Sequence, residues 1–337
     1  MKRVALALAV TVVLAGGLRA QPAGDIDRLR EKADITLDDR QQIRAWLQPL
    51  VADLAASTDP ELRRMIRART AIVASGRIDP AWSPAYVQAF GEEALAMIEA
   101  AAPRAVSPEA RLNLVMTVAD LRRIEAIGFL VKVLTEDPYA ATRYVAAKGL
   151  AELAPEVSRK GLVRAEEQVA QAARKAMEAE TTGLTFYRLL EALGQFDQAE
   201  AHDALAFGVG LAATRLKASD PVDVQVLAAA VRALERAYPT EVRPDGRERL
   251  LTAYALLATW ITPPVADPGL MGALNASLEK VTGARLGFSP GMDPVVQKLV
   301  LLEWVEKLVR EKRIPKRPAL PPAVEKVVER VLKGAGP

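Results

Sequence analysis

The sequence predicts an all-helical protein built from antiparallel pairs of short helices. Along most of the chain, apolar residues recur at spacings of three and four, which places them on one face of a helix. Alanine and leucine dominate these segments, and β-branched residues do not alternate with polar ones as in a half-buried strand. A helix-start signal, Asp or Ser followed by Pro, precedes seven amphipathic segments. These dipeptides are Asp59-Pro60, Ser83-Pro84, Ser107-Pro108, Asp137-Pro138, Asp220-Pro221, Asp267-Pro268 and Asp293-Pro294.

Residues 1–20 have the layout of a secretory signal peptide. Two basic residues precede an apolar run over residues 4–14, which is shorter than the ~20 residues of a membrane span. Cleavage is expected after Ala20, with cleavage after Gly17 as the alternative. The segment predicts a periplasmic or secreted protein without a transmembrane segment once the signal is removed, and an uncleaved anchor is the other interpretation.

The charge and the cysteine content exclude several kinds of function. The 337-residue chain has 45 basic and 42 acidic residues, and three of the basic ones lie in residues 1–20, so the mature chain is neutral. A neutral chain lacks the basic field that drives nucleic-acid binding, so no nucleic-acid partner is expected. The absence of cysteine excludes disulfides, a thiol nucleophile, a thiolate metal site and an acylated lipoprotein cysteine.

The first predicted helices follow a short charged helix over residues 24–34. Thr36 with Asp39 three residues later forms a capping pattern at the start of the next helix. Pro49 lies inside that helix and is expected to kink or break it. The apolar face of this helix consists of Ile43, Trp46, Leu47, Leu50 and Leu54.

The clearest helix pair spans residues 124–134 and 139–153. The first helix has one apolar stripe, and Asp137-Pro138 is expected to cap and start the second. Small residues in the second helix allow a neighbouring helix to approach closely. The stripe of the first helix is Ile124, Ile127, Leu130, Val131 and Leu134, and the second helix is expected to bury Tyr139, Thr142, Ala146, Leu150 and Leu153.

The second helix of this pair resembles that of the HEAT-repeat family. The family pattern of Val-Arg, two alanines, and leucines that alternate with small residues is similar to Thr142-Arg143, Ala146-Ala147, Gly149-Leu150, Ala151 and Leu153. The resemblance is strongest over residues 107–237, where similar segments recur about 75 residues apart, near twice a ~37-residue period. Gln225 stands where the family has arginine, and residues 161–180 depart from the pattern. The resemblance implies a right-handed α-solenoid of antiparallel helix pairs over residues 24–313.

The C-terminal part is less regular. Prolines and glycines in residues 263–268 and 283–294 predict loops, and residues 295–310 form a strong amphipathic pattern. Residues 314–322 hold four prolines and are expected to be extended. Residues 323–332 predict one more amphipathic helix, which would cap the array or bind back on it.

The residues that would support catalysis are not arranged for it. His202, the one histidine, lacks the second imidazole of a helical metal pair, so it is interpreted as structural or exposed. Neither a nucleophile elbow nor a phosphate-binding loop occurs, and the glycines of Gly208-Val209-Gly210 are interpreted as close helix packing. The adjacent acids Asp38-Asp39, Glu92-Glu93 and Glu166-Glu167 point about 100° apart on a helix and are interpreted as solvated faces. No catalytic residue, cofactor or metal is therefore predicted.

The resemblance also implies roles for residues of the central helix. In the family, the positions of Asp137 and Arg143 brace neighbouring repeats, so both are expected to be structural, with an acid or a carbonyl group of an adjacent unit as the partner of Arg143. Second helices of HEAT-like arrays line the concave, partner-binding side. Tyr144, Lys148 and Glu152 lie one row off the apolar stripe and are the candidate binding residues, with ordinary solvent exposure as the alternative.

A second candidate is a basic cluster near the C-terminus, offset by Glu311. Cations at a helix C-terminus interact favourably with the helix dipole and stabilise the helix by about 0.3–1 kcal/mol each, which accounts for part of the cluster. The alternative is contact with an anionic surface, either lipid headgroups or an acidic partner. The cluster consists of Lys307, Arg310, Lys312, Arg313, Lys316 and Arg317.

The leading hypothesis for function is an exported scaffold that binds another, unidentified protein and performs no catalysis. One alternative is an all-helical α/α-toroid enzyme acting on glycans, although four Trp, six Tyr and six Phe supply few aromatic platforms for sugar rings. Another is a protein that associates with the envelope surface through its basic C-terminal segment.

Overall fold

The computed structural model describes residues 23–56, 62–180, 183–215, 221–260, 268–283, 286–287 and 292–316. These residues form fourteen α-helices with short 3-10 turns and contain no strand, which confirms the all-helical prediction. The predicted signal peptide, Arg317 and the predicted helix over residues 323–332 lie outside the described residues.

In chain order, the first seven helices are α1 (Ala23–Leu29), α2 (Leu37–Ala56), α3 (Leu62–Gly76), α4 (Pro84–Ala101), α5 (Pro108–Leu121), α6 (Ile127–Glu136) and α7 (Ala140–Arg159). The next seven are α8 (Val163–Ala179), α9 (Gly183–Leu193), α10 (Ala199–Arg215), α11 (Pro221–Thr240), α12 (Pro244–Trp260), α13 (Pro268–Thr282) and α14 (Pro294–Arg310). Two 3-10 turns, η2 (Ala102–Arg104) and η3 (Ile124–Ala126), follow α4 and precede α6.

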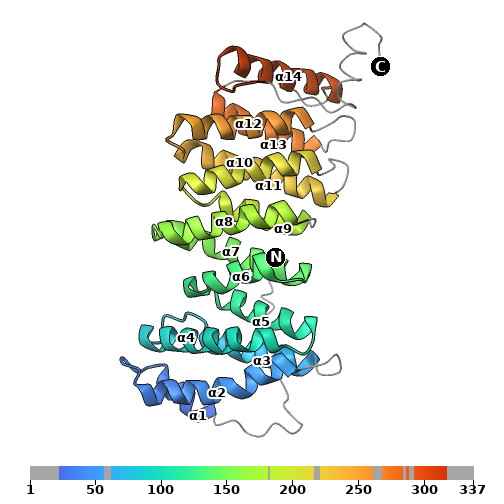
Figure 1. Cartoon of the computed structure of the whole chain (residues 1–337). Coiled ribbons are helices and arrows are strands. Elements are labelled where there is room, and N and C mark those ends of the chain that lie inside the picture. Colours follow the sequence, from blue (N-terminus) through green and yellow to red (C-terminus); the bar gives the residue numbers. More distant parts are fainter. Residues whose placement is uncertain are drawn as a thin grey trace, which may run out of the picture.

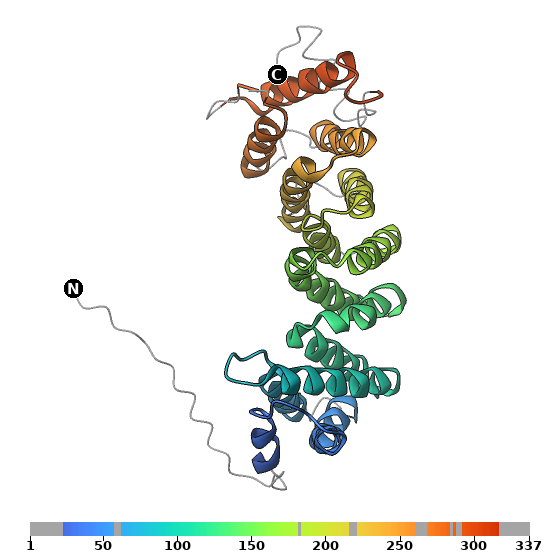
Figure 2. The ribbon, with the colours of Figure 1, turned by 90° about the vertical axis from the view of Figure 1, so that its left-hand side faces the viewer.

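The helices are stacked in two rows along one long axis (Figures 1 and 2). In the odd row, α3, α5, α7, α9, α11 and α13 each pack on the next odd-numbered helix. The even row contains α2, α4, α6, α8, α10, α12 and α14, and most of these also pack on their next even-numbered neighbour. A continuous cluster of buried apolar side chains fills the space between the rows. The predicted pair is part of this array, since α6 packs against α7.

The even row has a break between α4 and α6. Every other neighbouring pair of described helices in this row makes an extensive contact, whereas α4 and α6 have no comparable contact. At this position only α5 and α7 of the odd row continue the stack without interruption. Two hollows, of about 640 and 270 Å³, lie on either side of the turn that leads into α6.

Several helix starts agree with the Ser-Pro and Asp-Pro signals. Ser83 and Ser107 accept backbone N–H groups of α4 and α5, and Asp293 caps α14 in the same way. The helices α11 and α13 begin at the prolines of their dipeptides. Thr36 and Asp39 form the predicted reciprocal cap, because each side chain accepts the backbone N–H of the other residue. Asp59-Pro60 lies outside the described residues.

Asp137 does not cap α7 in the predicted way. The helix begins at Ala140, and Tyr139 takes the N-cap position. Asp137 Oδ1 instead accepts hydrogen bonds from the Tyr139 backbone N–H and from Thr142 Oγ1, at 3.0 and 2.9 Å. The Tyr139 side chain stays 42% exposed, so its predicted burial is wrong. With the Asp137 carboxylate buried, the chain runs so that the Tyr139 side chain faces solvent.

Pro49 does not break α2, which runs without interruption from Leu37 to Ala56. A proline inside a helix removes one hydrogen bond to the carbonyl group four residues earlier, here that of Ala45. Both residues are exposed, so water can satisfy that carbonyl group.

One acid of each adjacent pair is buried, which contradicts their interpretation as solvated faces. Asp39, Glu93 and Glu166 are only 2–3% exposed. Glu93 on α4 accepts hydrogen bonds from Arg40 and Arg44 of α2. Burial raises the pKa of Glu166. Glu93 takes its cationic partners from α2, and Asp39 pairs with Lys32 from the segment before α2. Periodicity within one helix reveals neither pairing.

The C-terminal end of the array is fixed by a buried lysine. Lys298 of α14 donates hydrogen bonds to the carbonyl groups of Ala258 and Thr259 in the last turn of α12. Such carbonyl groups lack partners within their own helix, and a cation also complements the dipole there. Burial lowers the pKa of Lys298 to about 7.

Candidate binding surface

Two residues predicted to be structural join α7 to α5 and to the end of α8. Arg143 Nε donates to Glu180 Oε2 at 2.9 Å, just after α8, and Arg143 Nη1 donates to the carbonyl groups of Asp137 and Pro138, each at 3.0 Å. The Asp137 carboxylate is fully buried and accepts a hydrogen bond from Arg111 of α5. These contacts fix the orientation of α7 relative to α5 and α8.

A second buried carboxylate holds α10, α11 and α12 together. Glu241 Oε2 lies 2.9 Å from His202 Nδ1 and also accepts from Arg243 Nη2 at 2.9 Å. The other His202 nitrogen lies 3.1 Å from the carbonyl oxygen of Phe196, so both nitrogens of this buried ring have protein partners. Burial raises the pKa of Glu241, but the hydrogen bonds from Arg243 and His202 outweigh it and hold the pKa at about 2. His202 is therefore a structural residue.

The candidate binding residues lie on the side of α7 that carries cross-helix polar contacts. Tyr144, Lys148 and Glu152 are all partly exposed and follow one another at a spacing of four. Lys148 Nζ lies 3.7 Å from Glu152 Oε1, and Arg122 Nε at the end of α5 lies 3.3 Å from Glu152 Oε2. On the other side, Arg188 of α9 lies close enough to Tyr144 to interact with it. We name Tyr144, Lys148, Glu152, Arg122 and Arg188 the α7 face.

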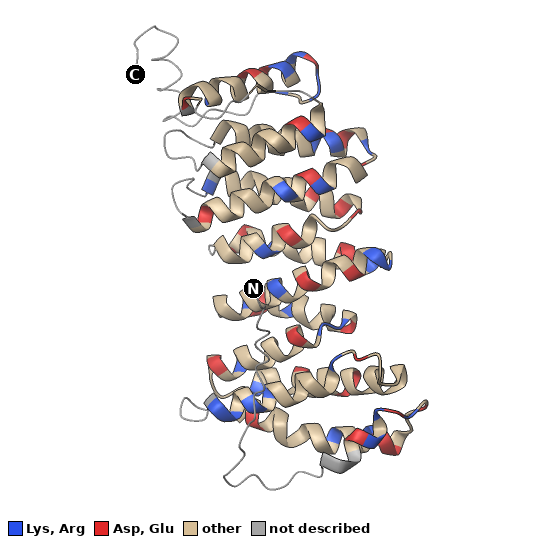
Figure 3. Ribbon diagram, turned by 180° about the vertical axis from the view of Figure 1, so that it is seen from behind, with Lys and Arg blue, Asp and Glu red and all other residues tan. Residues whose placement is uncertain are grey.

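The polar contacts continue along the odd row beyond the α7 face. Arg188 also forms an ion pair with Glu191 on α9 at 2.9 Å, and Glu235 of α11 pairs with Lys280 of α13 at 2.6 Å. In Figure 3, which views the odd row, segments with Lys or Arg lie beside segments with Asp or Glu at several places along this side. Side chains that already contact one another lose less conformational entropy when a partner binds.

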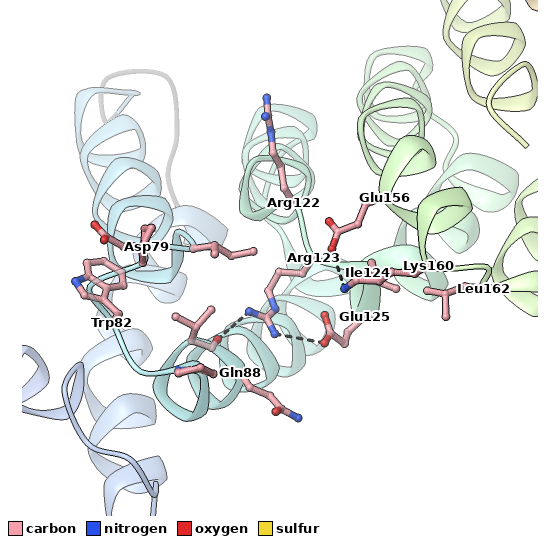
Figure 4. Close-up of a pocket in the computed structure, with 14 residues that line it drawn as sticks. Asp79, Trp82, Gln88, Arg122, Arg123, Ile124, Glu125, Glu156, Lys160 and Leu162 are labelled. Carbon is pink, nitrogen blue, oxygen red and sulfur yellow. Dashed lines mark hydrogen bonds and ion pairs between the residues drawn. The ribbon is translucent and has the colours of Figure 1, made fainter.

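A hollow of about 640 Å³ lies at the break in the even row, between the start of α4, the turn into η3 and the end of α7 (Figure 4). Buried Arg123 crosses it, donating from Nη1 to the Val87 carbonyl oxygen at 2.8 Å. Gly91 permits this, because a Cβ there would lie 2.1 Å from Arg123 Nε. Glu156 and Lys160 pair at 2.8 Å on the rim. The apolar walls come from Ile78, Trp82, Val87, Ile124 and Leu162.

This hollow was not predicted from the sequence, because its lining comes from four separate elements. Arg122, which caps α5, has a left-handed backbone with φ of 52°. Such a conformation is uncommon for a residue other than glycine, and it reverses the chain between α5 and η3. Nothing in the composition near Arg122 signals this turn.

The basic C-terminal cluster is divided by the fold. Arg313 turns inward, and its Nη2 donates to Tyr238 Oη of α11 at 3.3 Å. Lys307 lies 3.8 Å from Glu311, while Arg310, Lys312 and Lys316 are exposed. The exposed part of the cluster is therefore smaller than its sequence suggests.

Among the described residues, no helix is long and apolar enough to cross a membrane, and no group of three or more His, Cys, Asp or Glu side chains could hold a metal ion. In comparisons with known proteins, the chain matches no family model and no curated protein.

Proposed function

We propose that this protein is an exported scaffold, periplasmic or secreted, whose α7 face binds another protein without catalysis. We further propose that its two rows form a right-handed, HEAT-like α-solenoid over residues 24–313. The observation that carries the proposal is the α7 face itself, where three neighbouring helices contribute side chains that pair across the helix boundaries.

The geometry supports a protein partner over other classes. The α7 face presents a phenol, cations and an anion together, so it offers both donors and acceptors within a short distance. Protein interfaces use such mixed polar surfaces with aromatic anchors, of which Tyr144 is one. The elongated arrangement in Figures 1 and 2 also favours an open scaffold over the closed ring of a glycan-degrading toroid.

The test uses the mature protein as bait in an extract of the envelope in which it occurs, with captured proteins identified by mass spectrometry. Changing Tyr144, Lys148 and Glu152 together to Ala should reduce the recovery of a specific partner by about tenfold or more, because anchors at the centre of an interface carry most of the affinity. The matched control changes Gln171, Lys175 and Glu178 of α8 to Ala, three exposed residues of the even row. Undiminished capture by the α7 variant would exclude this face.

The C-terminal cluster supports a second candidate, association with an anionic envelope surface. Arg310, Lys312 and Lys316 are exposed together at the end of the array. Sedimentation with anionic lipid vesicles should then show binding that falls as salt is raised, since salt screens exposed charges. Loss of binding on changing these three residues to Gln would support it, and binding that is insensitive to salt would contradict it.

A further inference from the structure

The surface of α3 carries a concentration of arginine that the C-terminal cluster does not match. Residues 62–77 contain five arginines and no lysine, aspartate or glutamate. Arg63, Arg64, Arg67 and Arg77 are exposed, and Arg69 is partly buried. Figure 3 shows the resulting group of basic segments on α3, at the lower left.

Most of these arginines are free to bind a ligand. Arg64 pairs with Asp53 of α2 at 2.5 Å, and Arg69 Nη1 points to Met116 Sδ of α5 at 3.2 Å. Within the described residues, Arg63, Arg67 and Arg77 have no ion-pair partner. This differs from the α7 face, where Arg122 pairs with an acid of the next helix.

A hollow lies at the C-terminal end of α3 beside Arg77, about 20 Å along the helix from Arg63. It measures about 410 Å³ and lies between the ends of α3 and α5, lined by Val73, Arg77, Ile78, Asp120, Leu121 and Arg122. Ile78 is 62% exposed at its edge. The hollow therefore offers apolar contact beside the Arg77 and Arg122 side chains.

We propose that the α3 surface, formed by Arg63, Arg67, Arg77 and this hollow, docks an acidic polypeptide segment that places one apolar side chain against Ile78. The planar guanidinium forks match carboxylates with two parallel hydrogen bonds, which a lysine cannot do. A polypeptide is favoured over a lipid surface because a side chain can enter the hollow whereas a flat layer of headgroups cannot. The proposal extends the proposed function and shares Arg122 with the α7 face. Its test changes none of Tyr144, Lys148 and Glu152, so either proposal can fail alone.

The test measures binding of a fluorescein-labelled synthetic peptide of Asp and Glu residues with one central Leu, by fluorescence anisotropy on the mature chain. Changing Arg63, Arg67 and Arg77 to Gln should weaken binding by about tenfold or more, because three charge-assisted contacts are lost together. The matched control changes Arg159, Arg164 and Arg236 to Gln, three exposed arginines elsewhere whose loss alters net charge equally. The control should bind almost normally, and lysine at the three α3 positions should restore only part of the affinity.

Further arms distinguish the alternatives. A peptide with Asn and Gln in place of the acids should not bind, and replacing its Leu by Gly should weaken binding. Equal losses in the α3 and control variants would overturn the proposal in favour of general electrostatics. Binding to phosphatidylglycerol vesicles that requires the α3 arginines, without peptide binding, would overturn it in favour of a lipid surface. If the triple variant loses its helical circular dichroism, the peptide affinities of the single variants Arg67→Gln and Arg77→Gln are compared with that of the same control variant instead.

Discussion

At the scale of single residues, the fold depends on buried acids that are held by basic side chains from neighbouring segments. The Glu93 carboxylate pairs with Arg40 and Arg44, and the Glu241 carboxylate contacts Arg243 and His202. Removing one partner of such a pair leaves a buried charge uncompensated, which costs far more than an exposed ion pair contributes. These residues therefore determine how neighbouring helices are oriented.

Glu241→Gln should lower the free energy of unfolding at pH 7 by about 3 kcal/mol, given a pKa held at about 2 against an ordinary value of 4.5. A carboxyl group whose pKa is lower in the folded state stabilises the fold above its ordinary pKa, and this stabilisation is lost as the pH falls toward 2. The difference from the unmodified protein should thus shrink between pH 5 and pH 3 in urea denaturation.

The control for this experiment is Glu248→Gln, which changes an exposed acid of α12. It should alter stability by no more than about 0.5 kcal/mol at either pH. A Glu241 effect that stays constant across this pH range would contradict the role assigned to its charge.

The sequence predicts where acids and arginines occur but not which of them meet. Arg143 was expected to reach an acid or a carbonyl of a neighbouring unit, and the structure places it on Glu180 and on two carbonyl groups near Asp137. Asp39, Glu93 and Glu166 were expected on solvated faces, because a helical wheel shows neither the segments that cover a side chain nor the cations that pair with it.

At the scale of helices, local signals specify most starts, while close approaches between helices depend on small residues. Ser83, Ser107 and Asp293 cap their helices as their sequences predict. The approach of α9 to α11 occurs at Gly194, where a Cβ would lie 2.7 Å from Ala233 Cα and Cβ. No flexible side chain can move aside there, because the neighbour is backbone.

Gly194→Ala should therefore destabilise the protein by about 1–3 kcal/mol, the usual cost of overpacking. The matched change Gly128→Ala in α6 introduces a methyl group with no atom within 4 Å, so it should be neutral or stabilise by up to about 1 kcal/mol. Thermal denaturation of both variants measures the difference. Equal effects of the two changes would show that helix propensity, and not packing, determines the change in stability.

Helix existence was predictable because amphipathic periodicity and capping dipeptides are local properties of the chain. The start of α7 was not, since the Asp137 carboxylate is buried against Arg111 and Thr142 and Tyr139 becomes the N-cap. A competing tertiary contact overrides the local capping preference at this position.

At the scale of the whole molecule, each helix contacts mainly its neighbours in the stack. Each odd-row helix packs on the next odd-numbered helix, and no extensive contact joins the two ends of the array among the described helices. In such arrays, stability is approximately a sum of local units and the interfaces between them. A defect should therefore act near its own position.

Leu274→Ala in α13 removes a fully buried side chain and should cost about 2–5 kcal/mol locally. Amide hydrogen exchange, read by mass spectrometry, should accelerate in α11 and α13 and change little in α5. The reciprocal variant Leu114→Ala in α5 should reverse this pattern. Uniform acceleration along the chain in either variant would instead indicate one cooperative unit.

Part of the candidate site could be read from the sequence at this scale. A spacing of four placed Tyr144, Lys148 and Glu152 on one side of α7, and the structure leaves all three partly exposed. Their partners Arg122 and Arg188 were not predicted, because they lie on helices that only the stacking brings near. The α3 surface was missed because the sequence does not show which arginines of residues 62–77 pair with acids of other helices.

The break between α4 and α6 affects how the molecule responds to force. Elsewhere neighbouring helices make extensive contacts in both rows, whereas here they do so only in the odd row. The array is therefore softest at this joint, and flexing there changes the angle between the arginines of α3 and the side chains of α7. A partner that binds the α3 arginines and the α7 side chains together would therefore bend the array at this joint, and part of its binding energy would be used for this bending.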